Sequence, residues 1–472
     1  MRVLLLYPYY SETTTTFFEF LKNKIPPLGL LYVGSALKEK GHEVRLIDAE
    51  EKKIDLELLG KLIKNYNPQV IGISVTTPIF KRARETAAYL KKMLPNVLII
   101  FGGPHLASFP KISLEFEEID YGVVGEGEVT ICELIEAIEK KQNPERIKGI
   151  VFRKNNQIIQ TEPREMIQNL DEISFPAWDL IDIKNYHDIM SKRKAFVTMI
   201  SSRGCPYNCL WCDPEGRFGK TFRARSADNI LKEIDFLYNK YGIREILFYD
   251  DTFTVDRQRI VNLCNKILEK KWDLIWECRT RVNLVDEELI KLMAAAGCYR
   301  IRFGIESGND EVLKFVRKGI TKEQARKAVG WCKKYEIEVF TYFMLGLPTE
   351  TEESMQETIK FAIELNPDYT TFSPTIAFNK GNDLFKWAAE RGFIKKDYWE
   401  RFARGENLDP FPVLETNILN KNIILRYSKM AYKKFYLRPS FIWKKILSCR
   451  NIKNFKNYFL IGLNFLFGKI EA

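Results

Sequence analysis

The chain has 472 residues, of which 46% are hydrophobic, enough for two or three globular domains of ~150 residues each. The net charge of +11 is confined to one region. Residues 1–420 balance at 61 basic and 61 acidic side chains, whereas residues 421–472 hold twelve Lys or Arg and one acid, Glu471. Residues 1–10 lack a signal-peptide pattern, so we expect a cytoplasmic protein in which the nine cysteines serve metal or redox chemistry rather than disulfides.

Residues 1–145 alternate short apolar runs with amphipathic segments. This pattern predicts a Rossmann-like, doubly wound α/β domain with a parallel sheet. The expected strands are 3–6, 43–48, 70–74, 97–101 and 121–124, and the expected helices are 27–37, 56–65, 83–93 and 130–139.

Small and polar residues follow three of these strands, at the sheet edge where ligands of such domains bind. Glycines there let the backbone approach a ligand closely, and hydroxyl groups supply hydrogen bonds. The candidate ligand-binding residues are Thr76 and Thr77, then Gly102, Gly103 and His105, then Gly125, Glu126 and Gly127.

Residues 146–190 form a predicted linker that begins with a β-hairpin at 150–160 and packs on both neighbouring domains. Residues 191–383 then show strict β/α alternation, which predicts a partial (β/α)6 barrel with its site at the carboxyl ends of the strands. The expected strands are 195–200, 245–249, 274–278, 299–304, 338–344 and 369–372, and the expected helices are 226–240, 257–270, 286–296, 322–335 and 352–364.

The loop after the first barrel strand carries Cys205, Cys209 and Cys212 at the spacing C-x3-C-x2-C. Thiolates are the soft ligands that iron–sulfur clusters and zinc select. A zinc knuckle normally needs four protein ligands, and none of the three histidines lies near this loop in sequence. Three thiolates favour a four-iron cube with one open iron.

This spacing, with Trp211 before the last cysteine, resembles the cluster loop of the radical S-adenosylmethionine (SAM) superfamily. The order P-P-L-G-L, G-G-P-H and G-E-G-E ahead of it is similar to the cobalamin-binding domain of the B12-dependent radical SAM enzymes. The resemblance implies a [4Fe-4S] cluster, SAM, cobalamin and a reductant protein, flavodoxin or ferredoxin. The D-x-H-x-x-G motif is absent, so we expect no histidine on cobalt. Some family members keep the domain without binding cobalamin.

The resemblance also assigns SAM-binding residues at three strand ends. Asp250 and Asp251 would bind the amino group of SAM. For either aspartate alone, a structural role as a helix cap is equally consistent with the sequence. Arg279, with Arg281 as a second candidate, would bind the carboxylate through a guanidinium fork. Glu306 and Ser307 match the ribose motif, and Met344 belongs to the strip beside adenine. No residue is assigned to catalysis.

The family reading favours methylation of an unactivated carbon of a small-molecule or lipid substrate. An alternative with the same cofactors is oxidative cyclisation or rearrangement, as in the anaerobic tetrapyrrole cyclase branch. A second alternative is a cluster-bearing electron carrier or sensor, although a closed electron-transfer cluster needs four cysteines.

The other cysteines lie outside any cluster motif. We expect Cys132, Cys264, Cys298 and Cys332 to be structural, and Cys278, which ends a barrel strand, to point at the active site.

Residues 384–472 are predicted to be helical and to cap the open side of the barrel. Their basic, aromatic part, 421–472, repeats Ile452, Phe455, Phe459, Leu463 and Leu466 at helical spacing. This segment either packs on the barrel or makes a peripheral membrane contact; nucleic acid is the least favoured partner.

Overall fold

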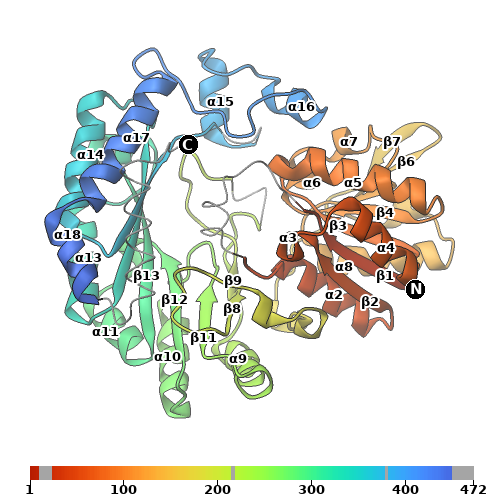
Figure 1. Cartoon of the computed structure of the whole chain (residues 1–472), viewed down its shortest axis with the longest axis horizontal. Helices are drawn as coiled ribbons and strands as arrows, with labels where there is room; N and C mark the ends of the chain where they lie inside the picture. The colour runs from red at the N-terminus through yellow and green to blue at the C-terminus, as the bar shows by residue number, and fades with distance from the viewer. Residues whose placement is uncertain (10–23, 214–217, 378–380, 449–472) are drawn as a thin grey trace.

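The computed structural model describes residues 1–9, 24–213, 218–377 and 381–448 (Figure 1). Its N-terminal sheet has seven strands in the order β2-β1-β3-β4-β5-β6-β7. The first five are parallel and the last two form an antiparallel hairpin at one edge. The strands are β1 (Arg2–Tyr7), β2 (Glu43–Asp48), β3 (Val70–Ser74), β4 (Leu98–Gly102), β5 (Tyr121–Val123), β6 (Ile150–Lys154) and β7 (Gln157–Gln160).

Helices cover both faces of this sheet, as the predicted doubly wound fold requires. Alternate residues of β1 point to opposite faces: Val3 and Leu5 pack with α2 and α8, and Leu4 and Leu6 pack with α4 and α5. The helices are α2 (Leu28–Glu39), α3 (Ala49–Lys52), α4 (Leu56–Tyr66), α5 (Phe80–Met93), α6 (Pro104–Ser108), α7 (Pro110–Ser113) and α8 (Gly127–Glu139). Two of them, α6 and α8, begin inside segments that we expected to be loops.

The hairpin expected within the linker pairs with β5 and belongs to the N-terminal sheet, and the segment that follows it contacts both domains. Trp178 is buried against Leu31 and Tyr32 of α2 in the core that it shares with the barrel, and the backbone N–H of Ala177 donates to the carbonyl of Leu31 at 3.0 Å. On the barrel side, Asp171 accepts a hydrogen bond from the backbone of Ser226.

The second sheet has six parallel strands in the order β15-β14-β13-β12-β11-β8. The outer strands, β8 and β15, are not paired with each other, so the barrel is open, and the N-terminal domain lies opposite its concave side (Figure 1). The strands are β8 (Phe196–Met199), β11 (Glu245–Phe248), β12 (Ile275–Thr280), β13 (Cys298–Glu306), β14 (Glu338–Leu345) and β15 (Tyr369–Pro374).

The barrel helices start where the sequence supplies an N-cap. In five of them a Ser, Asp or Thr side chain accepts a backbone N–H of the first turn: Ser226, Asp256, Asp286, Thr321 and Thr351. These helices are α9 (Ala227–Tyr241), α10 (Arg257–Lys270), α11 (Glu287–Ala295), α13 (Lys322–Lys334) and α14 (Glu352–Leu365), and a short helix, α12 (Asp310–Phe315), follows β13.

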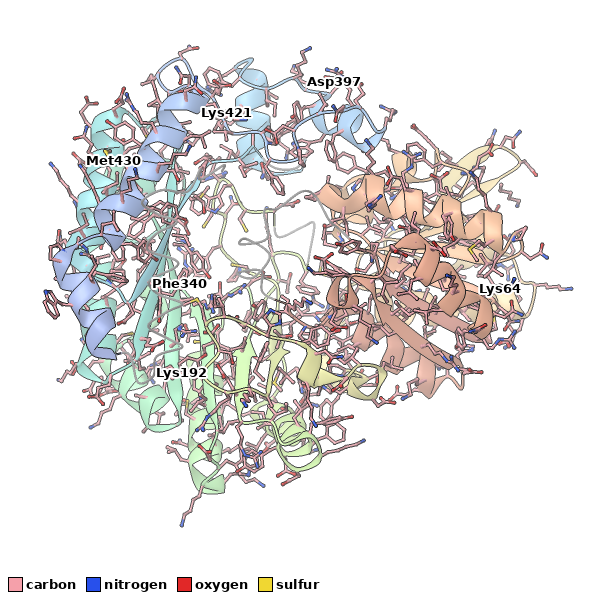
Figure 2. All side chains as sticks on the ribbon, in the orientation of Figure 1. Lys64, Lys192, Phe340, Asp397, Lys421 and Met430 are labelled. Carbon is pink, nitrogen blue, oxygen red and sulfur yellow. The ribbon has the colours of Figure 1, made fainter. Side chains whose placement is uncertain are left out.

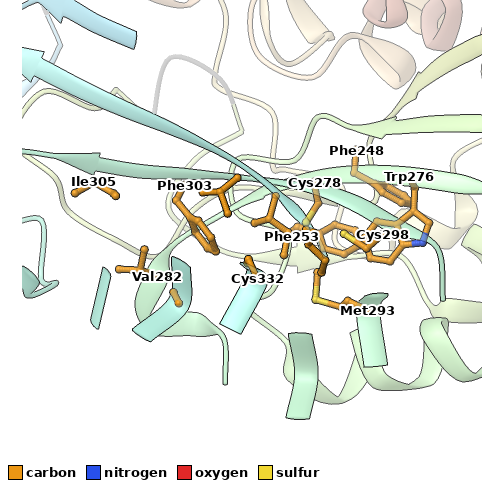
Figure 3. Close-up of a cluster of buried hydrophobic side chains, with 14 of the residues drawn as sticks. Phe248, Phe253, Trp276, Cys278, Val282, Met293, Cys298, Phe303, Ile305 and Cys332 are labelled. Atoms are coloured by element: carbon orange, nitrogen blue, oxygen red, sulfur yellow. The ribbon is translucent and has the colours of Figure 1, made fainter. Parts of the chain in front are cut away.

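The position of Cys278 corrects the prediction that this thiol points at the active site. Cys278 is fully buried between the sheet and the helices, in a cluster with Cys298, Cys332 and Met293 (Figure 3). Burial raises the pKa of the Cys278 thiol. It is a core residue, as are the four cysteines that we expected to be structural, all of which are buried.

The C-terminal region joins both domains. Helices α15 (Asp383–Glu390) and α16 (Tyr398–Ala403) form an apolar cluster with Phe109 of the N-terminal domain and Leu210 of the cysteine loop. Asp397, just before α16, marks this cap in Figure 2. The predicted helical cap is therefore present, and it contacts the loop that carries the cysteines.

The first part of the basic tail packs on the barrel. Helix α17 (Lys421–Tyr436) buries Ile424, Tyr427, Ala431 and Phe435 in the barrel core; Lys421 and Met430 mark this helix in Figure 2. Helix α18 (Pro439–Ser448) follows. The spaced residues Ile452, Phe455, Phe459, Leu463 and Leu466 lie outside the described residues. Among the helices described, none has the length and apolar character needed to cross a membrane.

Candidate cofactor sites

The cysteine loop leaves and re-enters the fold through a short antiparallel ladder. Strands β9 (Ser202–Arg203) and β10 (Arg223–Ala224) pair at the two ends of the loop. Gly204 follows β9 with φ of +84°, and a Cβ there would lie 2.2 Å from the carbonyl oxygen of Thr221. Only glycine suits that backbone and that space, so this residue sets the direction in which the loop departs.

The three loop cysteines form no disulfide and differ in accessibility: Cys205 and Cys209 are half-buried and Cys212 is exposed. Within the described part of the chain, no three His, Cys, Asp or Glu side chains converge as a ready-made metal site. Three soft donors on one loop suit a [4Fe-4S] cluster that keeps one iron open for a ligand.

The ends of three barrel strands meet this loop. After β11, the Thr252 hydroxyl lies 3.5 Å from the Cys205 sulfur. After β12, Nη1 of Arg281 lies 3.4 Å from the Cys209 sulfur. After β13, the backbone N–H of Leu210 donates to the carbonyl of Val316 at 3.0 Å. The strand ends predicted to bind SAM therefore surround the predicted cluster ligands.

The two adjacent aspartates after β11 differ in environment. Asp250 is buried, and its carboxylate accepts hydrogen bonds from the backbone and hydroxyl of Ser201 and from the hydroxyl of Ser202. Burial raises the pKa of Asp250, although nearby Arg259 and these hydrogen bonds oppose the rise. Asp251 is half-buried. The carboxylate of Asp250 therefore holds the end of β8.

The two arginines after β12 have different surroundings as well. Arg279 stacks on Tyr249, with 3.9 Å between Cζ and the ring centroid, and its Nε has no hydrogen-bond partner among the described residues. Arg281 contacts the Tyr207 ring and donates to the carbonyl of Lys318. The Nε of Arg279 could therefore donate to a carboxylate, whereas Arg281 contacts the cysteine loop.

A β-bulge displaces Glu306 at the end of β13. The register with β14 shifts between Gly304 and Glu306, and Glu306 takes a φ of +74°. Its carboxylate accepts from Nζ of Lys318 at 2.8 Å, and the same Nζ lies 5.3 Å from the ring centroid of Trp211. Bulges of this kind re-aim side chains next to active sites, and this one brings the ribose candidate toward the cysteine loop.

The two remaining SAM candidates lie at the ends of β13 and β14. Ser307 is buried, with its hydroxyl 3.2 Å from that of Thr358. Met344 is half-buried against the cap cluster. Just beyond it, the carboxylate of Glu350 accepts from the backbone of Gly346 and Leu347, and burial raises the pKa of Glu350 to about 8.

The N-terminal domain contains a cavity of about 300 Å³ between the sheet and helices α2 and α8. Its walls include Val3, Leu5, Val70 and Ile131, so the interior is apolar. Five of the predicted ligand-binding residues line it: Gly102, Gly103, Gly125, Glu126 and Gly127. A Cβ at Gly102 or Gly125 would meet no atom within 4 Å. These glycines therefore leave open space beside the cavity, as a bulky planar ligand requires.

The other three predicted contacts do not line this cavity. His105 is fully buried, stacked on Phe80 with ring centroids 3.8 Å apart, and its Nδ1 lies 3.2 Å from the Thr77 hydroxyl. Burial lowers the pKa of His105 to about 3. Thr76 precedes a short 3-10 helix. The His105 side chain packs with α5 instead of facing a ligand, and Thr77 is bonded to it.

The barrel side contributes Ile200, Arg203 and Phe218 to the cavity wall, and none of these was identified from the sequence. Their contribution depends on how the two domains dock, which no local pattern encodes. The only signal in the sequence for Arg203 is its position, two residues before Cys205.

Two family models match the chain in the order that the structure shows. The B12 binding domain matches residues 18–135, and the Radical SAM superfamily matches residues 199–362.

Full-length relatives cover both regions together. An uncharacterized methyltransferase of Pyrococcus horikoshii is 34% identical over 94% of this chain and 95% of its own length. The anaerobic magnesium-protoporphyrin IX monomethyl ester cyclase of Rubrivivax gelatinosus is 26% identical over 94% of this chain and 78% of its own.

Solved structures share the fold. The cobalamin-dependent SAM radical enzyme OxsB with aqua-cobalamin bound aligns with a TM-score of 0.72 at 18% identity, over 98% of this chain and 71% of OxsB. The methyltransferase TsrM of Kitasatospora setae, with cobalamin and a [4Fe-4S] cluster bound, aligns with a TM-score of 0.68 at 22% identity, over 82% and 74%. With its three-cysteine loop, its apolar cavity and a full-length relative at 34% identity, the chain belongs to the cobalamin-dependent radical SAM enzymes, which use a [4Fe-4S] cluster, SAM and cobalamin.

Proposed function

We propose that the protein methylates an unactivated carbon of a small-molecule or lipid substrate. The observation that carries this proposal is the 34% identity, over almost the full length of both chains, to a protein named as a methyltransferase. The position of the cavity adds support, because Ile200, Arg203 and Phe218 of the barrel side complete its wall. A ligand in this cavity therefore lies next to the segment that carries the cysteines.

The residues divide the work as follows in this proposal. Cys205, Cys209 and Cys212 hold the cluster, Asp251 and Arg279 bind the amino and carboxylate groups of SAM, and Glu306 accepts from the ribose hydroxyls. The bound cluster supplies the electron that cleaves SAM, and cobalamin supplies the methyl group. Apolar walls and glycines hold cobalamin without a histidine on cobalt, since His105 is turned into the core.

The deciding experiment uses anaerobically reconstituted protein, hydroxocobalamin, a reductant and SAM labelled with deuterium in its methyl group. Products from candidate substrates or cell extract are analysed by mass spectrometry. A product carrying the labelled methyl group supports methylation. A product that forms with 5′-deoxyadenosine release but without label contradicts it.

Oxidative cyclisation is the second candidate. It is favoured by three relatives named as anaerobic magnesium-protoporphyrin IX monomethyl ester cyclases, 26–29% identical over 84–94% of this chain. The same labelling experiment tests it, because cyclisation yields an unlabelled product that has lost hydrogen.

We also propose that flavodoxin or ferredoxin delivers the electron. The exposure of Cys212 supports this, because a cluster ligand near the surface shortens the distance to a docked donor. Reduction of the reconstituted cluster by either protein, followed by EPR, tests the proposal, and failure of both donors to reduce a cluster that dithionite reduces would contradict it.

A peripheral membrane contact is proposed for the tail beyond α17. Since α17 packs on the barrel, the contact falls to α18 and the residues after it. Ile442 and Trp443 of α18 are 41% and 64% exposed, and residues 437–472 carry seven Lys or Arg against one acid, a surplus of six positive charges. Amphipathic basic helices of this kind bind anionic lipid surfaces.

Vesicle co-sedimentation tests this contact, with nuclease-treated full-length protein and its Trp443→Ser variant. The proposal expects binding to anionic vesicles that exceeds binding to neutral ones and weakens in the variant. Equal, negligible sedimentation with both lipids would contradict it.

A further inference from the structure

The two ends of the cysteine loop converge on the N-terminal domain. Arg203 of β9 and Arg223 of β10 are direct cross-strand partners, and the loop between them carries the three cysteines. Both side chains are almost completely buried, at 4% and 3% exposure. Two buried guanidinium groups need acceptors close by.

Those acceptors come mainly from the Gly-Glu-Gly-Glu segment of the N-terminal domain. The Glu126 carboxylate accepts from Nη1 of Arg203 at 2.8 Å and from Nη1 of Arg223 at 2.9 and 3.0 Å. The backbone N–H of Ile167 in the linker donates to the same carboxylate at 2.7 Å. One carboxylate thus binds both strands at the base of the loop and the linker between the domains.

A second carboxylate completes the charge balance. Glu128 accepts from Nη2 of Arg203, so two carboxylates face two guanidinium groups. Burial alone would raise the pKa of Glu126, but the bonds to Arg223 and Arg203 outweigh it and hold the pKa below its usual range. The group is therefore a closed and neutral ion network.

This network touches both cofactor sites. Glu126, Glu128 and Arg203 line the cavity of the N-terminal domain, and Arg203 is two residues before Cys205. The guanidinium of Arg203 also lies over the rings of Tyr32 and Phe218, at 5.4 and 5.1 Å. A shift of Arg203 would therefore move the start of the cysteine loop and the cavity wall together.

Buried ion networks contribute little net stability, because desolvation offsets the attraction; their best-attested use is to specify one geometry over others. We propose that Glu126 is a positioning residue: its bonds to Arg203 and Arg223 fix the distance and orientation between the cobalamin cavity and the cluster loop. The inference rests on the cofactors of the family and holds whether the reaction is methylation or cyclisation.

The test measures geometry rather than turnover. Full-length protein is loaded with hydroxocobalamin and reconstituted with iron and sulfide, and then reduced until the cluster and cob(II)alamin are both paramagnetic. Dipolar EPR gives the distance distribution between them. The unaltered protein is expected to give one narrow distribution. The Glu126→Gln variant, which keeps the shape but loses the charge, is expected to give a broader or displaced one, with iron and cobalt content measured alongside.

The matched control is Glu115→Gln. Glu115 also binds an arginine across the domains, Arg404, but this pair is exposed, so the variant is expected to keep the narrow distribution. An unaltered distribution in Glu126→Gln would overturn the proposal.

If Glu126→Gln loses cobalamin, Arg223→Lys decides, because Arg223 lies outside the cavity wall and lysine keeps the charge but lacks the fork that reaches Glu126, Ile167 and Phe218. A changed distribution in Arg223→Lys supports the proposal, and an unchanged one overturns it.

Discussion

The two cofactor sites differ in the kind of side chains that form them. In the N-terminal domain, apolar side chains and glycines leave a cavity of about 300 Å³, so binding there depends on the shape of the space. The barrel site instead depends on charged side chains. The barrel interior also contains an ion network, in which the Glu277 carboxylate accepts hydrogen bonds from Arg300 and Arg302. Ligand binding in the cavity should therefore be weakened by a larger side chain that fills the space. Binding at the barrel site should be weakened by removing one member of a charged contact.

The largest effect is expected at the cysteine loop. Changing Cys205, Cys209 and Cys212 together to Ala removes every thiolate that the loop offers, so the reconstituted protein should bind no cluster and release no 5′-deoxyadenosine from SAM. Iron and sulfide analysis and chromatography measure both. Cys332→Ala is the control, since Cys332 lies in the core, and it should keep its iron. Zinc in place of iron in anaerobic protein would contradict the assignment.

The next largest effect is expected in the cavity of the N-terminal domain. Gly102→Phe places a ring in a space where a Cβ meets no atom within 4 Å, so the chain should fold normally while cobalamin affinity falls by about tenfold or more, ~1.4 kcal/mol. Spectral titration with hydroxocobalamin measures this. Gly330→Phe, on the exposed side of α13 where a Cβ is equally unhindered, is the control. Unchanged affinity in Gly102→Phe would show that corrin binds elsewhere.

A smaller effect is expected from Arg281. Its guanidinium lies 3.4 Å from the Cys209 sulfur, and positive charge and hydrogen bonds at cluster sulfurs raise the reduction potential. Arg281→Met should therefore make the cluster potential more negative, as measured by EPR during a redox titration. Arg317→Met, which breaks an exposed ion pair with Asp383, should leave it unchanged. An unshifted potential in Arg281→Met would show that this arginine does not act on the cluster.

The smallest effect concerns pH. The pKa of Glu350 is raised to about 8 by burial, so between the ordinary value of 4.5 and about 8 the folded chain keeps a proton that the unfolded chain releases. This group therefore makes the folded state less stable as pH rises through that window, by at most about 1.4 kcal/mol per pH unit. Glu350→Gln should flatten this part of the profile in urea unfolding from pH 5 to 9. A parallel profile in both proteins would contradict the shift.

The sequence predicted the barrel site better than the cavity. Cysteine spacing and strand-end charges are local, and the loops that carry them could be placed from the alternation of short apolar runs with amphipathic helices. The burial of a side chain and the direction in which it points depend on residues that are distant in the sequence. Nothing in the sequence shows that His105 turns into the core or that Glu126 binds two arginines of another domain.

The alternation of side chains along β12 determines which way Cys278 points. Cys278 and Arg279 are neighbours on β12, and successive strand residues face opposite sides. Both could not point into the barrel, and the polar Glu277 and Arg279 already identified the inner face. The helix-facing position of Cys278 therefore followed from the same alternation that placed the strand.

The way α17 completes the barrel has a consequence for synthesis of the chain. The Ser428 hydroxyl donates to the carbonyl of Phe372 in β15, the Tyr432 hydroxyl accepts from the backbone of the same residue, and Ile424 sits on Gly346. The outer strand of the barrel is therefore covered only when residues 421–436 have left the ribosome. Until then the face of β15 that α17 covers stays open to solvent, so this edge of the barrel is completed only after that helix has been synthesised.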